Sequence, residues 1–244
     1  MSERLEQLVI RLLPLCVTDN TGAKRLPPER ELGAALDMSR GALREQLSQL
    51  ENLGVLTRRQ GHGSYLDTPD ATFIRTYFSL MRQLDYLSND QFAQAREMLE
   101  VTIAASAARI ATKDDIQDLR ALVEQMLQLT AASDSDGALE ADLRFHDRLY
   151  AIVNNPIFNI LNEGLSHVLR NDMRVRRDLA NSIEAPNADG SRNTDAVHHG
   201  IVDALAAHDP EAARAAMTQH FSDFSMLTQS AVRVQALAAS STEK

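Results

Sequence analysis

The chain has 244 residues, of which 44% are hydrophobic and 24% charged, and its formal net charge is −9. This composition excludes an intrinsically disordered protein, and no apolar run approaches the roughly 20 residues that a membrane-spanning helix needs. The single cysteine, Cys16, excludes an intrachain disulfide, and the N-terminus lacks the layout of a signal peptide, so we expect a cytoplasmic protein.

The charge is divided unevenly along the chain. Residues 1–68 contain nine Lys or Arg and nine Asp or Glu, so the whole net charge of −9 lies in the remaining residues. Such asymmetry indicates two modules with different partners. We therefore predict one domain over residues 1–68 and a second over residues 69–240.

The first domain carries its signals in the order helix, helix, helix, strand, turn, strand. Apolar residues at helical spacing predict the N-terminal helix, and residues 18–25 then have the composition of a loop. Residues 26–37 open with prolines suited to a helix start, and residues 39–54 run from an N-cap serine to a glycine. Residues 55–59 and 63–67 are short strand-like runs on either side of a glycine-containing turn, which predicts a hairpin.

Two short helices joined by a tight turn, the second with basic residues at its start, predict a helix-turn-helix. In that motif the first residues of the second helix reach base edges in the major groove. Arg40 and Arg44 are four residues apart and share one face, and the guanidinium fork matches the O6 and N7 atoms of guanine. The small Gly41 lets the helix end approach the bases. The alternative is a solvated face on which these arginines pair with Glu45 or Glu51.

The hairpin that follows has the residues of a DNA-contacting wing. Arg58 and Arg59 precede the turn, and Gln60, Gly61 and His62 form it. The glycines permit the turn, while the basic and polar groups are suited to a phosphate backbone or a minor groove.

Residues 26–66 resemble the winged helix-turn-helix of the GntR transcription regulators. The resemblance is carried by the Pro-x-Glu-Arg-Glu start, the Ser-Arg…Arg-Glu segment and the Gln-Gly-x-Gly turn. Gly41 departs from the pattern, because many members have a hydroxyl residue there. The resemblance implies DNA contacts by Arg30, Ser39, Arg40, Arg44 and Gly61, with Gln60 and His62 flanking in the wing.

From residue 69 onward strand signals disappear, and the breaks between apolar runs predict about seven helices. These are expected near residues 71–88, 90–111, 113–132, 136–153, 156–180, 193–207 and 209–238. The predicted fold class is therefore mainly α, a winged helix-turn-helix followed by an all-α antiparallel bundle.

Several polar residues fall inside the apolar stripes of these helices. Asp142 and His146 share one stripe, and His198 and His220 lie on the stripes of two further helices. One carboxylate and three imidazoles facing a bundle interior are a plausible set of metal ligands, because a cation offsets the cost of the buried charge. Each histidine alone would more often be a hydrogen-bonded core residue. Arg96 also points inward, either as the partner of Glu100 or as the counterion of an anionic ligand.

This second region resembles the FCD effector domain of the FadR-type branch of the same family. The resemblance is carried by residues 94–111, 142–156 and 198–220. It implies a metal set of Asp142, His146, His198 and His220, with effector contacts by Arg96 and Asn155. It also implies a small carboxylate effector, such as a sugar acid, a hydroxy acid or a dicarboxylate. Zinc, nickel or manganese are the candidate metals.

These features favour a metabolite-responsive DNA-binding regulator over two other functions. We expect a homodimeric repressor on a palindromic operator, with no membrane partner. A metal-dependent hydrolase or lyase is disfavoured because the chain has no His-Glu-x-x-His motif, nucleophile elbow or glycine-rich phosphate loop. A purely structural DNA-bending protein leaves the inward Asp and His set unexplained. We therefore predict that the protein is not an enzyme.

Overall fold

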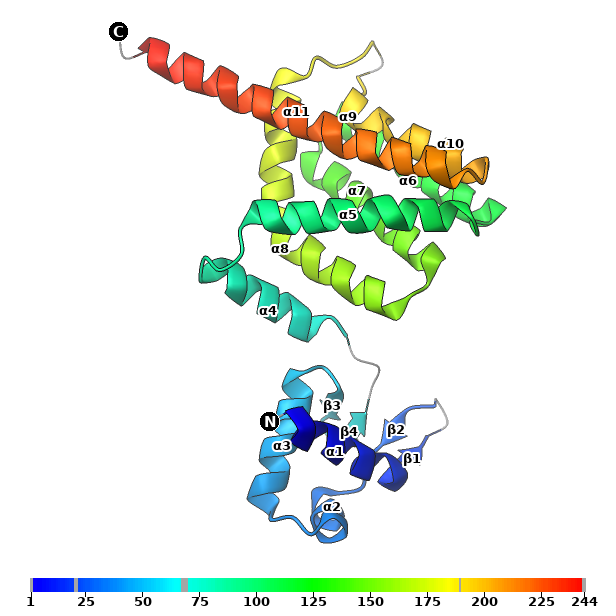
Figure 1. Ribbon diagram of the computed structural model, residues 1–244, viewed down its shortest axis with the longest axis vertical. Coiled ribbons are helices and arrows are strands. Elements are labelled where there is room, and N and C mark those ends of the chain that lie inside the picture. The colour runs from blue at the N-terminus through cyan, green and yellow to red at the C-terminus, as the bar shows by residue number, and fades with distance from the viewer. Residues whose placement is uncertain (1, 20–21, 67–69, 189, 243–244) are drawn as a thin grey trace. The chain divides into compact units, whose positions relative to one another are not determined.

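The computed structural model describes residues 2–19, 22–66, 70–188 and 190–242, with side chains described between residues 5 and 227 of these ranges. The chain forms two compact units, Met1–Tyr77 and Phe78–Lys244. The division falls inside helix α4 (Thr72–Gln83), nine residues after the boundary that we predict from the sequence (Figure 1). Within the described ranges, no helix is both long enough and apolar enough to cross a membrane.

The first unit is a winged helix-turn-helix, as predicted. Its elements are α1 (Ser2–Leu12), the 3-10 helix η1 (Leu13–Leu15), β1 (Val17–Thr18), β2 (Lys24–Arg25), α2 (Glu29–Leu36), α3 (Arg40–Asn52), β3 (Leu56–Arg59) and β4 (Gly63–Leu66). Its buried core consists of leucines from the helices and the wing, namely Leu8, Leu12, Leu26, Leu32, Leu36, Leu43, Leu47, Leu50, Leu56 and Leu66. The inward face of α3 is formed by its three leucines, Leu43, Leu47 and Leu50.

A short turn determines where α3 begins. Asp37 adopts the left-handed conformation with φ 51°, which ends α2. The backbone N–H of Met38 then donates to the carbonyl of Gly33 at 2.9 Å. Ser39 starts the next helix, because its hydroxyl accepts a hydrogen bond from the backbone N–H of Ala42 at 3.2 Å. The N-terminal turn of α3 is therefore held firmly against α2.

The small sheet is larger than the sequence predicts. Its strand order is β1-β2-β4-β3, and every neighbouring pair is antiparallel. Residues 18–25 are expected to be a loop, but Thr18 and Lys24–Arg25 belong to paired strands of two residues each. Strands of this length contain no alternating pattern, and they form because β2 adds to the edge of β4.

The second unit is an all-helical bundle. Its helices in the described part of the chain are α5 (Asn89–Ala108), α6 (Lys113–Ala131), α7 (Ser135–Val153), α8 (Pro156–Ile183), α9 (Asn193–Ala196), α10 (His198–Ala206) and α11 (Pro210–Thr242). Ser88 and Thr112 form capping boxes at the starts of α5 and α6. The continuous helix predicted over residues 193–207 is wrong, because the chain breaks at Val197 between α9 and α10.

Helix α5 lies at the centre of this bundle. It packs against α7, α8 and α11, and α11 runs antiparallel beside it (Figure 1). The largest buried side chains here include Phe145 and Tyr150 of α7, which are 0% and 2% exposed. Each of α5, α7, α10 and α11 therefore presents an interior face to the others, and polar residues on those faces are removed from water.

Candidate functional site

The start of α3 is an exposed basic surface on the first unit. The side chains of Ser39, Arg40, Gly41 and Arg44 are all solvent-exposed. A Cβ added at Gly41 would have no neighbouring atom within 4 Å, so the protein leaves open space beside this residue. This is the arrangement that the sequence predicts for a helix that enters the major groove.

Arg44 has a partner that the sequence does not reveal. Its Nε donates to Glu29 Oε2 of α2 at 2.7 Å, and the Arg44 side chain is still 71% exposed. The pair therefore joins the two helices of the motif, in place of the predicted alternatives Glu45 and Glu51. Exposed ion pairs are weak, so Arg44 can exchange this carboxylate for a nucleic-acid acceptor at little cost. Arg30 is exposed on the same helix, α2.

The wing carries the predicted basic and polar residues at its tip. Arg58 lies 3.3 Å from Glu51, and the guanidinium of Arg59 stacks 4.3 Å from the centre of the Tyr65 ring. Gly61 adopts φ 74°, a conformation that favours glycine. The Nδ1 atom of His62 lies 3.0 Å from the Gln60 carbonyl oxygen. The exposed hairpin therefore presents both cations and hydrogen-bonding groups.

In the second unit, the four predicted metal ligands meet in the bundle interior. Asp142 and His146 come from α7, His198 from α10 and His220 from α11. Each is at most 9% exposed, and one potential ligand atom from each lies within 4.8 Å of the others. Three helices that are distant in sequence thus bring together the set that the spacing and the resemblance predict.

Hydrogen bonds determine which ring nitrogens face the centre of this cluster. His198 Nδ1 lies 2.8 Å from the backbone oxygen of Asp195, which can only accept, so in the neutral ring Nε2 carries the lone pair. His146 Nδ1 lies 2.5 Å from Glu100 Oε2, a close contact that lacks hydrogen-bond alignment but turns Nδ1 towards a carboxylate. The Nε2 atoms then face Asp142 Oδ1, which lies 3.2 Å from Nε2 of His198 and 3.8 Å from Nε2 of His146.

These facing lone pairs fit a cation. Neither Nε2 atom of His146 or His198 has a hydrogen-bond partner within the described part of the chain. Lone pairs of nitrogen and carboxylate oxygen repel one another unless a positive charge lies between them. One zinc-like ion with bonds of about 2.0–2.2 Å would hold such atoms roughly 3–4 Å apart. The spacing of these groups therefore suits a divalent metal.

The electrostatics of the cluster also favour ligands without protons. Burial opposes the charged form of Asp142, but the neighbouring His198 and His146 outweigh burial and hold the pKa of Asp142 well below its usual range. Burial, followed by the charges of the other two histidines, lowers the pKa of His220 well below its ordinary value. The carboxylate is thus ionised and the His220 imidazole neutral, as metal ligation requires.

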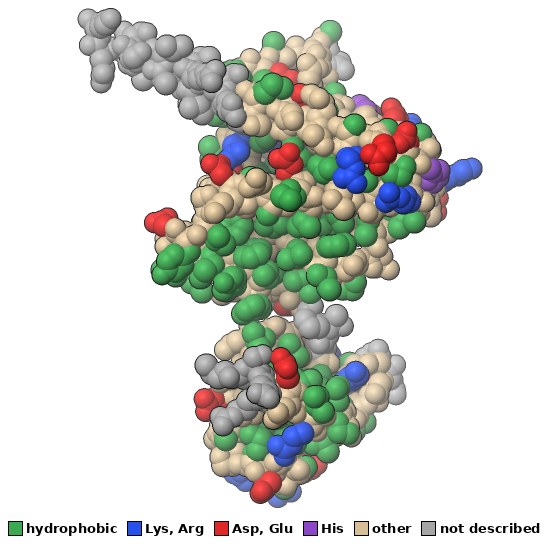
Figure 2. All heavy atoms as spheres, in the orientation of Figure 1, with side chains coloured by type: hydrophobic (Ala, Val, Ile, Leu, Met, Phe, Trp, Pro, Cys, Tyr) green, Lys and Arg blue, Asp and Glu red, His purple; other side chains and the backbone are tan. Residues whose placement is uncertain are grey.

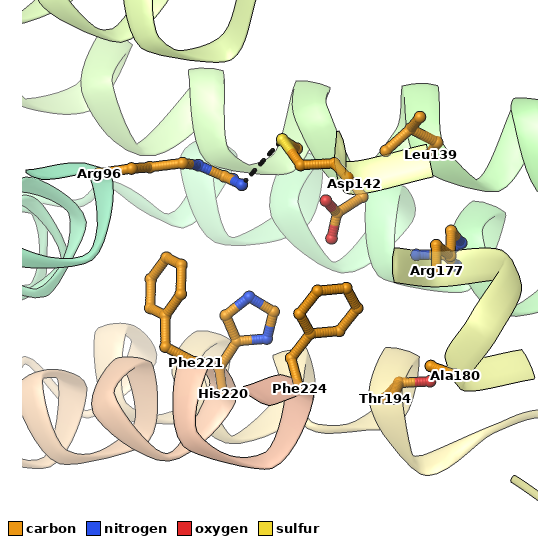
Figure 3. A pocket seen from close by; sticks show the side chains of 10 residues that line it. Arg96, Leu139, Asp142, Arg177, Ala180, Thr194, His220, Phe221 and Phe224 are labelled. Atoms are coloured by element: carbon orange, nitrogen blue, oxygen red, sulfur yellow. Dashed lines mark hydrogen bonds between the residues drawn. The ribbon is translucent and has the colours of Figure 1, made fainter. Parts of the chain in front are cut away.

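A small pocket adjoins the cluster and contains the predicted cation Arg96. The pocket is lined by Arg96, Leu139, Asp142, Met173, Arg177, Ala180, Thr194, His220, Phe221 and Phe224 (Figure 3). Arg96 is 7% exposed and comes from α5. Its Nη1 lies 3.2 Å from the sulfur of Met173, the contact dashed in Figure 3. A thioether is a weak acceptor, so this nitrogen is available to a better one.

Of the two alternatives for Arg96, the ion pair with Glu100 is confirmed. Its Nε donates to Glu100 Oε1 at 2.5 Å, and the Glu100 side chain is only 1% exposed. Burial alone would lower the pKa of Arg96, but the carboxylates of Glu100 and Asp142 keep it above its ordinary value. The guanidinium is therefore a permanent buried cation with one edge paired and another edge in the pocket.

Sequence reasoning names Glu100 only as a partner of Arg96, and it misses Arg177 and Asp195. Glu100 contacts both Arg96 and His146, while Arg177 and Asp195 form a second buried ion pair. The helical spacing of the sequence could have identified Glu100 and Arg177 as buried residues. Glu100 continues the inward spacing of Arg96 on α5, and Arg177 continues that of the buried Met173 on α8. Nothing in the sequence marks Asp195, because it lies beside the unpredicted break.

Asn155 does not take the place expected for an effector contact. Its side chain caps α8, accepting from the backbone N–H of Ile157 at 3.0 Å, and it is not among the residues that line the pocket. An asparagine directly before a proline is a common way to start a helix. That local role accounts for the residue, and the structure does not bring it together with Arg96.

Comparison with known domain families matches both units. A model described as "Bacterial regulatory proteins, gntR family" matches residues 21–66. A second model, described as "FCD domain", matches residues 91–223, more than half of the chain. The first match covers the exposed basic surface and the wing. The second covers the Asp and His cluster and the residues that line its pocket, except Phe224.

Individual proteins are similar over most of the chain. The "Putative L-lactate dehydrogenase operon regulatory protein" of Escherichia coli (strain K12) is 30% identical over 203 residues, covering 81% of this chain and 75% of the relative. The "HTH-type transcriptional repressor NanR" of Enterobacter sp. (strain 638) is 29% identical over 231 residues, 92% of this chain and 82% of the relative. A solved structure described as "Streptococcus agalactiae GntR" has 26% identity and a TM-score of 0.59, covering 90% of this chain and 94% of that one.

Proposed function

This chain belongs to the GntR family of bacterial regulatory proteins and carries an FCD domain, and from that premise we propose that it is a repressor controlled by a metal-bound carboxylate. Both of its domains are domains of DNA-binding transcription regulators, and its relatives are named as such regulators and not as enzymes. The proposal concerns the ligand, the metal, the direction of regulation and the assembly.

One observation carries the proposal for the second unit. The lone pairs of His146 and His198 face a carboxylate oxygen of Asp142, next to a pocket that contains the partly unpaired guanidinium of Arg96. Asp142, His146, His198 and His220 would hold a divalent cation, which when bound would supply positive charge and open coordination positions for an anion. Arg96 would donate to that anion through its free edge. A small carboxylate is the ligand that satisfies both.

We further propose that the protein binds its operator as a homodimer. One winged helix reads only a half-site, so a palindromic operator requires two copies. Exposed apolar side chains on the second unit support a self-association surface. Met98 of α5 and Ile157 of α8 are 68% and 67% exposed. Figure 2 shows that hydrophobic side chains gather on one face of the second unit. The repressor assignment is supported by the relative whose name is "HTH-type transcriptional repressor NanR".

The coupling between the two functions has a simple thermodynamic form. A carboxylate alters operator affinity only if it favours one arrangement of the two DNA-binding units over another. Couplings of this kind are typically about 1–3 kcal/mol, or roughly 5–150-fold in affinity. The effect therefore lies well within the range of a binding assay.

The experiment uses an operator selected from random DNA by the zinc-loaded protein. Operator affinity is measured with and without zinc, and with lactate or gluconate added. Release of the operator by one acid, only when zinc is present, is the expected result. A matched double variant, His198→Ala with His220→Ala, should still bind the operator but lose stoichiometric zinc and the response. If that variant keeps its zinc, or responds normally without it, the histidines are only core residues and the proposal is wrong.

A further inference from the structure

The pocket beside the metal cluster contains a second buried arginine, Arg177 of α8. We propose that Arg177 binds an uncharged oxygen at the end of the effector opposite its carboxylate. The effector is then a short monocarboxylic acid that carries a hydroxyl or carbonyl group away from the acid group. This inference rests on the proposed function, because it assumes that the carboxylate lies at the metal and Arg96.

The position of Arg177 supports this role. Both guanidinium groups line the pocket, and Figure 3 shows Arg96 and Arg177 on opposite sides of Asp142. Arg96 comes from α5 and Arg177 from α8, so the two cations approach from different helices. A ligand whose carboxylate is held near Arg96 would extend its other end towards Arg177.

Arg177 has an unused donor. The residue is 8% exposed, and its Nη2 bonds Asp195 Oδ1 and, at 3.1 Å, Thr130 Oγ1. Its Nε, however, is buried and has no hydrogen-bond partner in the part of the chain that the structure describes. A buried donor without a partner is destabilising. A ligand oxygen that accepts from Nε would remove this cost.

The size of the pocket limits the ligand to a small molecule. The cavity volume is about 40 Å³, and a single water needs roughly 10–15 Å³ by this measure. The space therefore suits about three water molecules, or an acid of about three carbons. Leu139, Phe221 and Phe224 form apolar walls. Besides the arginines and the metal ligands, Thr194 is the other hydrogen-bonding residue among the described lining residues, and its hydroxyl already donates to Glu184 at 2.8 Å.

The buried charges indicate that the far end of the ligand is neutral. In the described part of the second unit, three buried carboxylates face two buried guanidinium groups. The carboxylates are those of Glu100, Asp142 and Asp195, and the guanidinium groups are those of Arg96 and Arg177. These groups carry one net negative charge, which a divalent cation changes to one net positive charge. A monocarboxylate then neutralises the site, whereas a dicarboxylate leaves an uncompensated buried charge, which is costly.

The experiment compares three acids that differ only at the third carbon. Lactate has a methyl group there, glycerate a hydroxyl and tartronate a second carboxylate. Their affinities for the full-length, zinc-loaded protein are measured by calorimetry. Glycerate is expected to bind at least about tenfold tighter than lactate, since a hydrogen bond to a charged group is worth about this factor. Tartronate should bind more weakly than glycerate.

The variants test whether Arg177 is the source of this preference. Arg177→Lys keeps the charge beside Asp195 but lacks Nε, so glycerate should bind no better than lactate, while lactate affinity changes little. The double variant Arg177→Met with Asp195→Asn removes both charges and provides the same test if the lysine variant does not fold. The control is Arg174→Lys, one turn earlier on α8, where the arginine is 46% exposed and paired with Asp136. The control should keep the wild-type preference.

The possible failures are distinguishable. Equal binding of lactate and glycerate to the wild-type protein would overturn the role of Arg177. So would a glycerate preference that survives in a folded Arg177 variant, or tartronate binding more tightly than glycerate. Failure of all three acids to bind a protein that holds zinc would instead overturn the carboxylate part of the proposed function.

Discussion

Replacing Glu100 with glutamine tests how the metal cluster is held in place. The two oxygens of Glu100 serve different partners, because Oε1 accepts from Arg96 Nε at 2.5 Å and Oε2 lies 2.5 Å from His146 Nδ1. Glutamine has almost the same shape but only one acceptor oxygen. Its amide NH₂ must therefore face either a donor of Arg96 or the Nδ1–H of His146.

Two effects of this substitution can be estimated from the structure. Glu100 and Arg96 are 1% and 7% exposed, and removing one partner of such a buried ion pair costs about 3–5 kcal/mol in the free energy of unfolding. If the amide donates to His146 Nδ1, the imidazole proton must move to Nε2, where it blocks the metal. Loss of such an orienting partner typically lowers metal affinity about 10–100-fold.

Chemical denaturation of the metal-free protein measures the first effect, and zinc competition with a chelator measures the second. The matched control is Glu97→Gln, on the same helix but only partly buried, and it should change neither quantity by more than about 0.5 kcal/mol. The reasoning is refuted if Glu100→Gln leaves the zinc affinity within twofold of wild type. Unchanged stability would show that Arg96 is not held by this carboxylate.

Three further predictions concern the DNA surface, the assembly and pH. Arg40→Ala and Arg44→Ala should each weaken operator binding by about 1–3 kcal/mol and relax base preference, and equal losses on random DNA would show that they touch only phosphate. The protein should sediment as a dimer, and Met98→Glu, which places a charge on an exposed apolar face, should weaken it. A wild-type monomer at concentrations that saturate the operator would contradict that assembly. Burial lowers the pKa of His220, so below about pH 6.5 the unfolded chain binds a proton that the folded metal-free protein does not. The free energy of unfolding of the metal-free protein should therefore decrease as the pH falls below that value, and zinc affinity should decrease with it. A free energy of unfolding that does not change from pH 7 to 5 would exclude a neutral buried His220.

Periodicity explains how much of the site could be predicted from the sequence. The i, i+4 spacing of Asp142 and His146 fixes both on the buried face of α7. The same reasoning places His198 and His220 inward on α10 and α11. The structure confirms that these four side chains are buried. Periodicity does not show that they meet, because that depends on how the helices pack; the family resemblance predicted that they form one set.

The contacts that the sequence does not reveal are those between helices. No local pattern shows that Arg44 of α3 pairs with Glu29 of α2, or that Glu100 of α5 reaches His146 of α7. The same holds for β1 and β2, which are too short to show alternation and depend on pairing with β4. The break at Val197 is likewise a tertiary feature, because it leaves the Asp195 carbonyl free to accept from His198.

The two arginines of the pocket are connected to the metal ligands by the same kind of link. Glu100 joins Arg96 to His146 through its two carboxylate oxygens. Asp195 joins Arg177 to His198, using its side chain for the arginine and its backbone oxygen for the imidazole. An acid that draws on either arginine therefore acts on a group that also orients a metal ligand.

Metal and acid should consequently bind cooperatively rather than independently. Linkage requires that the factor by which zinc raises the affinity for the acid equals the factor by which the acid raises the affinity for zinc. The two shared residues, Glu100 and Asp195, supply a structural reason for that factor to exceed one, since a ligand on Arg96 or Arg177 restrains the same residues that hold His146 and His198. The arrangement also explains why carboxylates that do not point at the metal are kept in a buried core, where an unpaired charge would be destabilising.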